Sequence, residues 1–282
     1  MILRKISVCL FSLIFPVVLL AQEEPDNRPV RSPFEASTLI DNQTIVSPLK
    51  RGLEFHIHHR FGTVENGISD IFGIYAPSNI RLGLDYGITD NLMVGLGTEK
   101  DYKLQELHWK YSIFQQTRSG SMPVALSYYG NVVLDLRDSS SFGPIDKYRH
   151  IHRFSYFNQL ILARRFNAKL SLMLAPGFIY FNAVEKGMNN AHVGLSVGGR
   201  YKVTSGMSVI GEYDQLLTKN GAEGVKPNIA LGVEFGTATH AFRLFMASYK
   251  NIINQRNLVY NTNDFLKGDI LFGFNITVRF AV

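Results

Sequence analysis

The sequence has almost no cysteine, little excess charge and only one long apolar run. Its single cysteine, Cys9, lies in an N-terminal stretch that we expect to be removed, which excludes disulfides and cysteine-ligated metal sites from the rest of the chain. The formal net charge is +6, and it falls by two, to +4, without Arg4 and Lys5. So small a positive balance gives no reason to expect a nucleic-acid partner.

The N-terminal stretch is typical of a secretory signal. Two cations, Arg4 and Lys5, precede an apolar run from Ile6 to Leu20, and Ala21 comes just before polar residues begin. The run is too short to span a membrane as a helix. We therefore expect residues 1–21 to be a signal peptide that is cleaved after export.

No helix-length apolar run follows this signal, so any insertion into a membrane has to use strands. The segment 268–282 has the required pattern, with apolar side chains at alternate positions: Ile270, Phe272, Phe274, Ile276, Val278 and Phe280. Such alternation marks a strand with one apolar and one polar face, and roughly 9–11 residues let a tilted strand cross a bilayer. The segment predicts a membrane-spanning strand, and an aromatic-rich final strand is how outer-membrane barrels usually finish.

The same alternation recurs along the chain. It is found in segments 52–61, 79–87, 92–99, 106–114, 123–135, 152–164, 169–181, 191–203, 207–217, 227–236 and 240–250. With the closing segment these make about twelve strands, an even number, as expected for a bacterial single-chain barrel.

The links between the segments alternate in length. Those after even-numbered strands are short, whereas those after odd-numbered strands are mostly longer, notably 62–78, 137–150 and 251–267. Barrels with short periplasmic turns and long outer loops have this rhythm, and a soluble β-sandwich has no reason to show it. We predict an all-β fold, a transmembrane antiparallel β-barrel over residues 51–282 in the outer membrane.

Residues 22–50 precede the first strand and are polar, with several prolines and no sustained periodicity. Loop-like segments usually lie on surfaces, which favours an extended periplasmic leader. The alternative is a partial plug, because the apolar residues Ile40, Ile45 and Val46 could enter the mouth of the barrel.

Several segments resemble a known family. They are RPVRSPFEASTLIDNQTIVSPLKRGLEFHIHHRFGTVENGISDIFGIYAPSNIRLGLDYGITDNLMVGLG, SYFNQLILARRFN, GRYKV and GFNITVRF. The sequence is similar, over essentially all of the exported chain, to a family of Bacteroidota outer-membrane β-barrel proteins known as domain of unknown function 5777. The resemblance implies location and architecture, and it implies no activity and no functional residues.

The polar faces of the strands provide the candidate lumen-lining residues. These are Glu54, His56, His58, Arg60, Arg81, Asp85, Glu106, His108, Lys110, Arg200, Glu212, Glu234, Arg243 and Arg279. Acids and bases are about equal in number along the lumen face, which favours a network of mutually paired charges over a strongly ion-selective pore. Many glycines on this face leave room, which makes some passage plausible in a barrel wider than the eight-stranded kind.

Two kinds of catalytic or metal chemistry are weakly supported. Histidines on the first, fourth and eighth strands would have to meet across the lumen to bind a metal or haem, and no HExxH-type spacing supports such a site. The best candidates for a hydrolase are His152, Ser155 and Asn158. His152 and Ser155 would have to pair, but residues three apart on a strand point to opposite faces. We therefore expect no catalytic residues, no metal and no cofactor.

The functional expectation follows from architecture alone. The leading hypothesis is a porin-like passive channel or carrier for a small solute, with loops 62–78 and 251–267 shaping the outer entrance. The alternative is a closed structural or partner-binding barrel whose residues 22–50 dock a periplasmic protein, and the third is an outer-membrane hydrolase. Outer-membrane lipid and, during insertion, the barrel-assembly machinery are the expected partners.

Overall fold

The computed structural model describes residues 25–219, 221 and 224–281, so the predicted signal peptide, residues 1–21, lies outside the described residues. Within the described chain, the strands are β1 (Gly52–Thr63), β2 (Asn79–Gly87), β3 (Leu92–Glu99), β4 (Leu104–Phe114), β5 (Ala125–Asp135), β6 (Phe154–Arg165), β7 (Leu170–Phe181), β8 (Ala191–Lys202), β9 (Met207–Leu216), β10 (Asn228–Gly236), β11 (His240–Ala247) and β12 (Leu271–Ala281). The helical segments are α1 (Asn254–Tyr260) and the 3₁₀ segments η1 (Val64–Asp70), η2 (Asp101–Lys103), η3 (Ser139–Phe142), η4 (Ile145–Lys147), η5 (His150–Arg153) and η6 (Phe265–Lys267). No helix in these ranges is long and apolar enough to cross a membrane.

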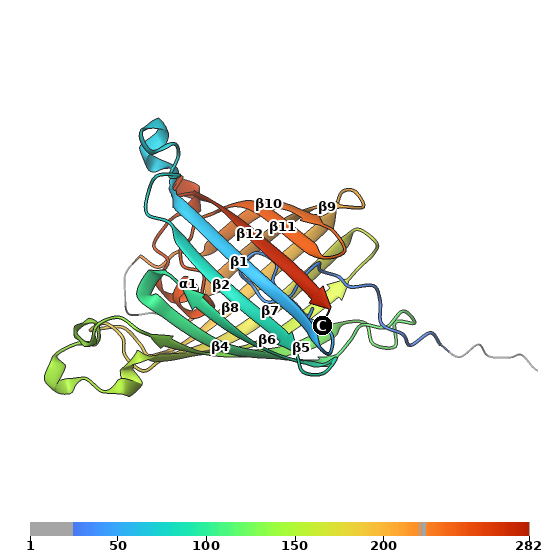
Figure 1. Cartoon of the computed structure of the whole chain (residues 1–282), viewed down its shortest axis with the longest axis horizontal. Coiled ribbons are helices and arrows are strands. Elements are labelled where there is room, and N and C mark those ends of the chain that lie inside the picture. The colour runs from blue at the N-terminus through green and yellow to red at the C-terminus, as the bar shows by residue number, and fades with distance from the viewer. Residues whose placement is uncertain (1–24, 220, 222–223, 282) are drawn as a thin grey trace, which may run out of the picture.

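The strands form one closed antiparallel barrel (Figure 1). Each strand pairs with its neighbours in sequence, and β1 pairs with β12 to complete the wall, with His56 opposite Thr277. The predicted all-β, twelve-stranded barrel is therefore confirmed, and the strands begin and end within a few residues of the alternating segments.

Alternation of side chains places apolar residues outside and polar residues inside. In β7 every second side chain is buried from Ser171 to Phe181, and the residues between them, such as Leu172 and Leu174, are exposed on the outer surface. Exposed leucines around a whole wall are unfavourable in water and favourable against acyl chains. The alternation of side chains therefore gives the barrel wall an apolar outer surface.

The barrel interior is filled at one end by the segment that we call the plug, residues 34–46. Its residues Ser37 and Thr44 pair through a backbone hydrogen bond, and the turn between them points into the lumen. Residues 34 and 36–44 are buried, and Leu39 and Ile40 lie in the main apolar cluster. The sequence favoured an extended periplasmic leader and left a partial plug as the alternative. This part of residues 22–50 packs inside the barrel, as in the alternative, because the wall supplies partners for its backbone groups.

The other end is filled by the outer loop, residues 248–270, which connects β11 to β12. Its helix α1 lies within the barrel outline in Figure 1 and contacts β6 and β9. Leu258 and Val259 join the main apolar cluster, and Ile253 packs against Leu104. The outer loop therefore occupies the lumen as well as shaping its entrance.

Candidate functional site

The lumen-lining residues predicted from the sequence face the interior, and all of them except Arg279 are buried. Arg279 lies at the end where the short turns are found, where its side chain is 25% exposed and donates to Glu54 Oε1 at 3.1 Å. The arrangement of these residues around the plug defines the candidate site.

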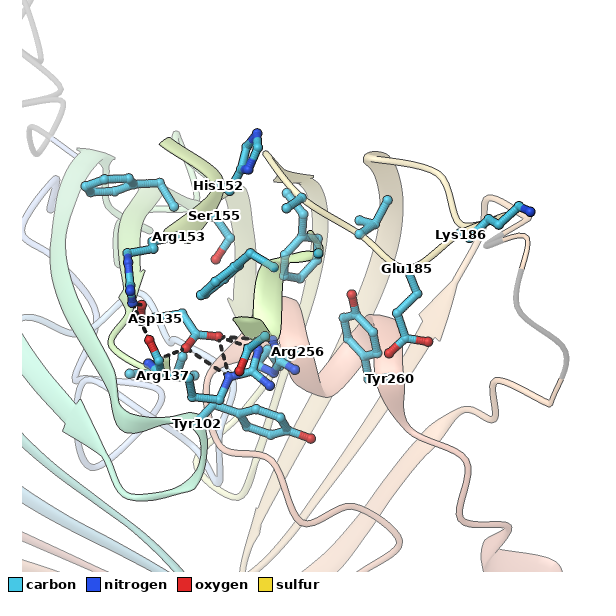
Figure 2. A pocket seen from close by; sticks show the side chains of 18 residues that line it. Tyr102, Asp135, Arg137, His152, Arg153, Ser155, Glu185, Lys186, Arg256 and Tyr260 are labelled. Carbon is cyan, nitrogen blue, oxygen red and sulfur yellow. Dashed lines mark hydrogen bonds and ion pairs between the residues drawn. The ribbon is translucent and has the colours of Figure 1, made fainter. Parts of the chain in front are cut away.

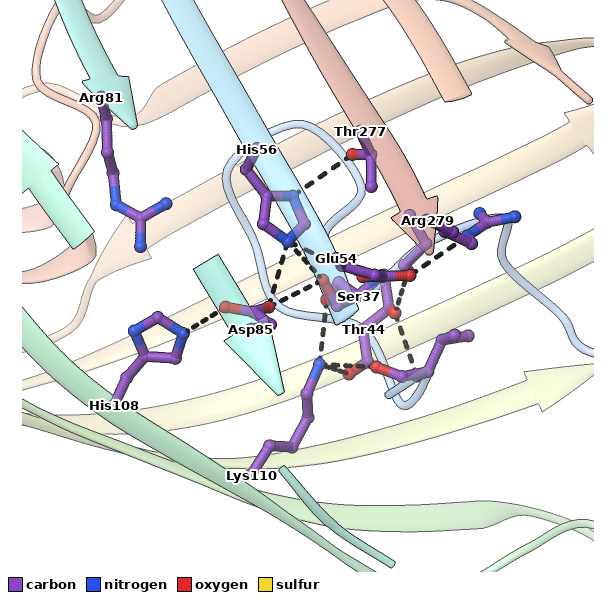
Figure 3. Close-up of polar contacts among 12 residues, drawn as sticks. Ser37, Thr44, Glu54, His56, Arg81, Asp85, His108, Lys110, Thr277 and Arg279 are labelled. Atoms are coloured by element: carbon purple, nitrogen blue, oxygen red, sulfur yellow. Dashed lines mark hydrogen bonds and ion pairs between the residues drawn. The ribbon is translucent and has the colours of Figure 1, made fainter. Parts of the chain in front are cut away.

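Lys110 of β4 binds the backbone of the plug (Figure 3). Its ammonium group donates to the carbonyl oxygens of Ser37, Thr44 and Val46 at 3.0, 3.0 and 2.7 Å. The lysine is fully buried, so this cation is satisfied by the plug alone. Three charge-assisted hydrogen bonds on a buried group make Lys110 the main cationic anchor of the plug.

Glu212 of β9 binds the tip of the plug as an acceptor, whereas Lys110 binds the plug as a donor. Its carboxylate accepts backbone hydrogen bonds from Ile40, Asp41 and Asn42 at 2.7, 3.1 and 3.1 Å. The next inward residue on the same strand, Asp214, accepts from the Asn42 side chain at 2.7 Å. The wall therefore provides a carboxylate for amides that a buried turn would otherwise leave without partners.

An ion pair adds to these contacts. Arg60 of β1 donates to Asp41 Oδ1 at 2.5 Å, and His58 Nδ1 lies 3.5 Å from the same oxygen. Burial alone would raise the pKa of Asp41, but the charge of Arg60 together with His58 holds that pKa below its ordinary value. Asp41 is therefore ionised at neutral pH and couples the plug electrostatically to the first strand.

A chain of imidazoles and carboxylates crosses from β1 to β4 (Figure 3). His56 Nε2 lies 3.1 Å from Asp85 Oδ2, and His108 Nε2 lies 2.7 Å from Asp85 Oδ1. We expected histidines of the first and fourth strands to stay apart because β2 and β3 separate them. They meet because β3 has Gly95 at this level, where a Cβ would lie 2.2 Å from His108 Nε2.

Part of this chain has the spacing of a metal site. One ligand atom from each of Glu54, His56 and Asp85 lies within 4.8 Å of the others. In this arrangement the same groups have protein partners, since Arg279 pairs with Glu54 and Thr277 is 3.3 Å from His56 Nδ1. The hydrogen-bonded network accounts for these residues without requiring an ion.

Further ion pairs join neighbouring lumen-lining residues at the short-turn end of the barrel. Glu234 accepts from Arg200 at 2.8 Å and from Arg243 at 2.9 Å. Arg200 also donates to Glu35 of the plug at 2.7 Å. Elsewhere in the lumen, Arg81 of β2 pairs with Glu106 of β4, and the second oxygen of Glu106 accepts from Tyr129 of β5 at 2.9 Å.

The glycines of the lumen face do not leave an open path. Long side chains occupy the space beside them, as Arg81 does beside Gly83 and Gly97, and Met173 and Leu39 do beside Gly198. A gap beside Asp41 and His58 has a volume of about 10 Å³, enough for roughly one water molecule. The passage expected from these glycines is therefore closed by the plug and the outer loop.

A larger cavity opens at the outer end of the lumen, and we call it the outer cavity (Figure 2). It has a volume of about 400 Å³ and is lined by cations and aromatic rings. Figure 2 labels Tyr102, Asp135, Arg137, His152, Arg153, Ser155, Glu185, Lys186, Arg256 and Tyr260 around it. Sequence reasoning did not select Arg256, although the spacing of Arg256 and Tyr260 by four residues was a usable signal for a helix-borne pair.

The residues weighed for a hydrolase do not form a catalytic pair in the described chain. Ser155 Oγ accepts from Gln255 Nε2 at 3.3 Å, and His152 Nδ1 lies 3.3 Å from the backbone nitrogen of Arg149. Asn158 accepts from Tyr128 at 2.5 Å and alternates with the buried residues of β6. His152 and Ser155 both line the outer cavity, yet no hydrogen bond joins them.

The comparisons identify the family. The membrane bound beta barrel domain, domain of unknown function 5777, matches residues 34–280. The chain belongs to this family. It is an outer-membrane β-barrel, and the match begins at the first residue of the plug, so the family pattern includes that segment. No curated protein matches the chain in sequence.

Solved structures share the fold. The NanC porin aligns with a TM-score of 0.52 at 10% identity, covering 82% of this chain and 100% of that one. An outer-membrane channel from Pseudomonas putida F1 aligns with a TM-score of 0.50 at 11% identity, covering 83% of this chain and 97% of that one. These structural alignments show a porin-like barrel fold. Because the sequence identities are so low, the function has to be argued from the site.

Proposed function

We propose that this protein is an outer-membrane channel for small solutes that opens when the plug leaves the lumen. The observation that carries the proposal is that the wall is complete without the plug, because β1 pairs directly with β12. The plug is tied to that wall by Lys110, Glu212 and Arg60 through hydrogen bonds and an ion pair. Such contacts can be exchanged for contacts with water without breaking the sheet.

The position of the leader supports a plug that moves. Residues 28–30 pair with 116–118 at the short-turn end, the periplasmic end in barrels of this kind. The plug thus enters and leaves through one rim. The architecture shared with the NanC porin and the Pseudomonas channel is consistent with passive diffusion once the plug has moved.

Conductance across a planar bilayer tests the proposal. We expect the exported chain to be closed for most of the time, and a variant lacking residues 25–48 to conduct steadily. A second variant also replaces residues 252–260 with a glycine-serine linker, which removes the outer closure. Heat-modifiable migration on gels verifies that each variant has a folded barrel. If both folded variants fail to conduct, the channel proposal is wrong.

A second candidate function is docking of a periplasmic protein by the leader. It is favoured by residues 25–29, which are exposed where a periplasmic partner could reach them. Deleting residues 25–33 should then abolish crosslinking to that partner while the barrel stays folded and the plug stays in place. A folded barrel that never conducts but loses a partner on this deletion would support docking over transport.

A further inference from the structure

Arg256 of α1 differs from the other arginines of the outer cavity. Its side chain is 12% exposed, and it donates no hydrogen bond to any residue that the structure describes. The closest carboxylate oxygen, Asp135 Oδ2, lies 4.0 Å from its Nη1. Its Nε is buried without a hydrogen-bond partner, and Nη1 has only the distant Asp135 carboxylate, so an acceptor from outside the chain is expected here.

The neighbouring arginines are already engaged. Arg137 binds Asp135 through two parallel hydrogen bonds of 3.0 and 2.7 Å. Arg153 donates to the carbonyl oxygens of Asp135 and Arg137 and to the Tyr148 hydroxyl. The carboxylate of Asp135 is therefore held closely by Arg137, and Arg256 shares it only through an ion pair of 4.0 Å.

Two tyrosines hold Arg256 in position. Its guanidinium carbon lies 3.7 Å from the centre of the Tyr102 ring and 4.8 Å from that of Tyr260 (Figure 2). Cation–π packing of this kind acts on the faces of the guanidinium group. Its N–H donors lie in the plane, so an oxyanion can bind them in that plane without displacing the rings.

We propose that the outer cavity binds a small organic anion whose carboxylate is received by Arg256. The volume of about 400 Å³ lies within the range of small-molecule sites, roughly 300–1,000 Å³. Its lining has more cations than acids, since Lys186 joins the three arginines while Asp135 and Glu185 are the carboxylates. This goes beyond the channel proposal, because a ligand can bind here whether or not the plug moves.

Three probes of nearly equal shape test the site. Benzoate, benzamide and benzylammonium are titrated into the purified, folded barrel in detergent, and binding is followed by calorimetry. We expect benzoate to bind, benzamide to bind at least about tenfold more weakly, and benzylammonium not to bind, because only benzoate supplies a charged acceptor. Equal binding of the three probes, or no binding of benzoate, would overturn the proposal.

Two variants locate the ligand. Arg256→Gln should weaken benzoate binding by at least about tenfold, because the charge-assisted contact is lost. Lys267→Gln removes an exposed cation of the same outer loop that does not line the cavity, and benzoate binding should be unchanged. If the two variants bind benzoate alike, the site is elsewhere. Since the probe series uses the unaltered chain, it decides the question even if Arg256→Gln does not fold.

Discussion

The two segments that close the lumen are held by different forces. The plug is bound through ionisable side chains of the wall: Lys110 donates to three carbonyls, Glu212 accepts from three amides, and Arg60 pairs with Asp41. The outer loop has one contact of the same kind, because Glu99 accepts hydrogen bonds from the backbone amides of Ile252 and Ile253. It also has two partly exposed ion pairs, Lys250 with Asp101 at 3.4 Å and Asp264 with Lys226 at 3.1 Å. Most of its contacts inside the lumen are neutral side-chain pairs and buried apolar groups.

Gln255 illustrates the neutral pairs of the outer loop, because its amide exchanges hydrogen bonds with Asn131 at 3.3 and 3.0 Å. Leu258 and Val259 add apolar burial. Apolar contacts are insensitive to protonation, whereas charged contacts respond to pH and to substitution of single ionic groups. The comparison teaches that the plug is the closure whose release responds to charge and pH, whereas movement of the outer loop must exchange mainly apolar contacts.

The largest expected effect is that of Lys110→Met. The variant leaves the plug carbonyls of Thr44 and Val46 without a buried partner and removes one of the two donors from that of Ser37, which should disfavour the docked plug by at least about 3 kcal/mol. We expect the open probability in planar bilayers to rise by more than about a hundredfold. Arg164→Met, which removes an exposed cation from the outer face of β6, should leave it unchanged. Equal behaviour of the two variants would contradict the role of Lys110.

A second pair of variants compares Glu212, which binds the plug, with Glu99, which binds the outer loop. Glu212→Gln replaces one of the two oxygens that accept from three plug amides with a donor, and should raise the open probability by about tenfold, for a loss of about 1–2 kcal/mol. Glu99→Gln should raise it much less, because apolar contacts retain the outer loop. The contrast between plug and outer loop fails if Glu99→Gln opens the barrel as much as Glu212→Gln does.

A third prediction concerns the wall itself. Gly95→Ala would place a Cβ 2.2 Å from His108 Nε2 and 2.5 Å from Asp85 Oδ1, so the network from β1 to β4 must shift. We expect a loss of about 1–3 kcal/mol in the free energy of unfolding, measured by urea denaturation in detergent. Gly206→Ala is the control: its added Cβ would have Gly236 O at 3.8 Å as its only near contact, and the change should stay within about 0.5 kcal/mol.

The smallest expected effect is a dependence on acid. Because the folded pKa of Asp41 is depressed, its contribution to docking is fully present above the ordinary value of 3.8 and is lost as pH falls through the folded value. The open probability of the unaltered chain should therefore begin to rise as the pH falls below about 4, the ordinary value of an aspartate pKa. In Asp41→Asn it should already be raised at pH 7, with a smaller further increase in acid. An identical acid response in both proteins would exclude Asp41 as the titrating group.

Alternation and loop length were sufficient to predict the barrel wall. Each inward residue of β1, from Glu54 to Arg60, follows from period two, and the same holds for β4. The plug was not predictable in this way, because Lys110 and Glu212 bind backbone carbonyls and amides, which every residue has. Binding through backbone groups leaves no pattern of residue types in the leader, and the side-chain contacts of Glu35, Asp41 and Asn42 are too few to form one.

The meeting of His56 and His108 on Asp85 was missed for a different reason. Strand order alone keeps β1 and β4 apart, and only the missing side chain of Gly95 lets the long side chains bridge that distance. Arg256 was missed because the spacing of Arg256 and Tyr260 indicates a helix of about two turns at most and does not show that this helix enters the lumen. The histidine contacts and the position of Arg256 both depend on the shape of a neighbouring segment. The local sequence pattern contains no information about that shape.

The plug is attached to the rim at both of its ends, and this has a mechanical consequence. Residues 28–30 are paired with the turn between β4 and β5, and residue 46 is only six positions before Gly52, where β1 begins. A segment fixed in this way can swing outward like a hinged flap and return to the same contacts, with no free end to rethread and no strand to separate. Opening would then be a reversible event rather than partial unfolding.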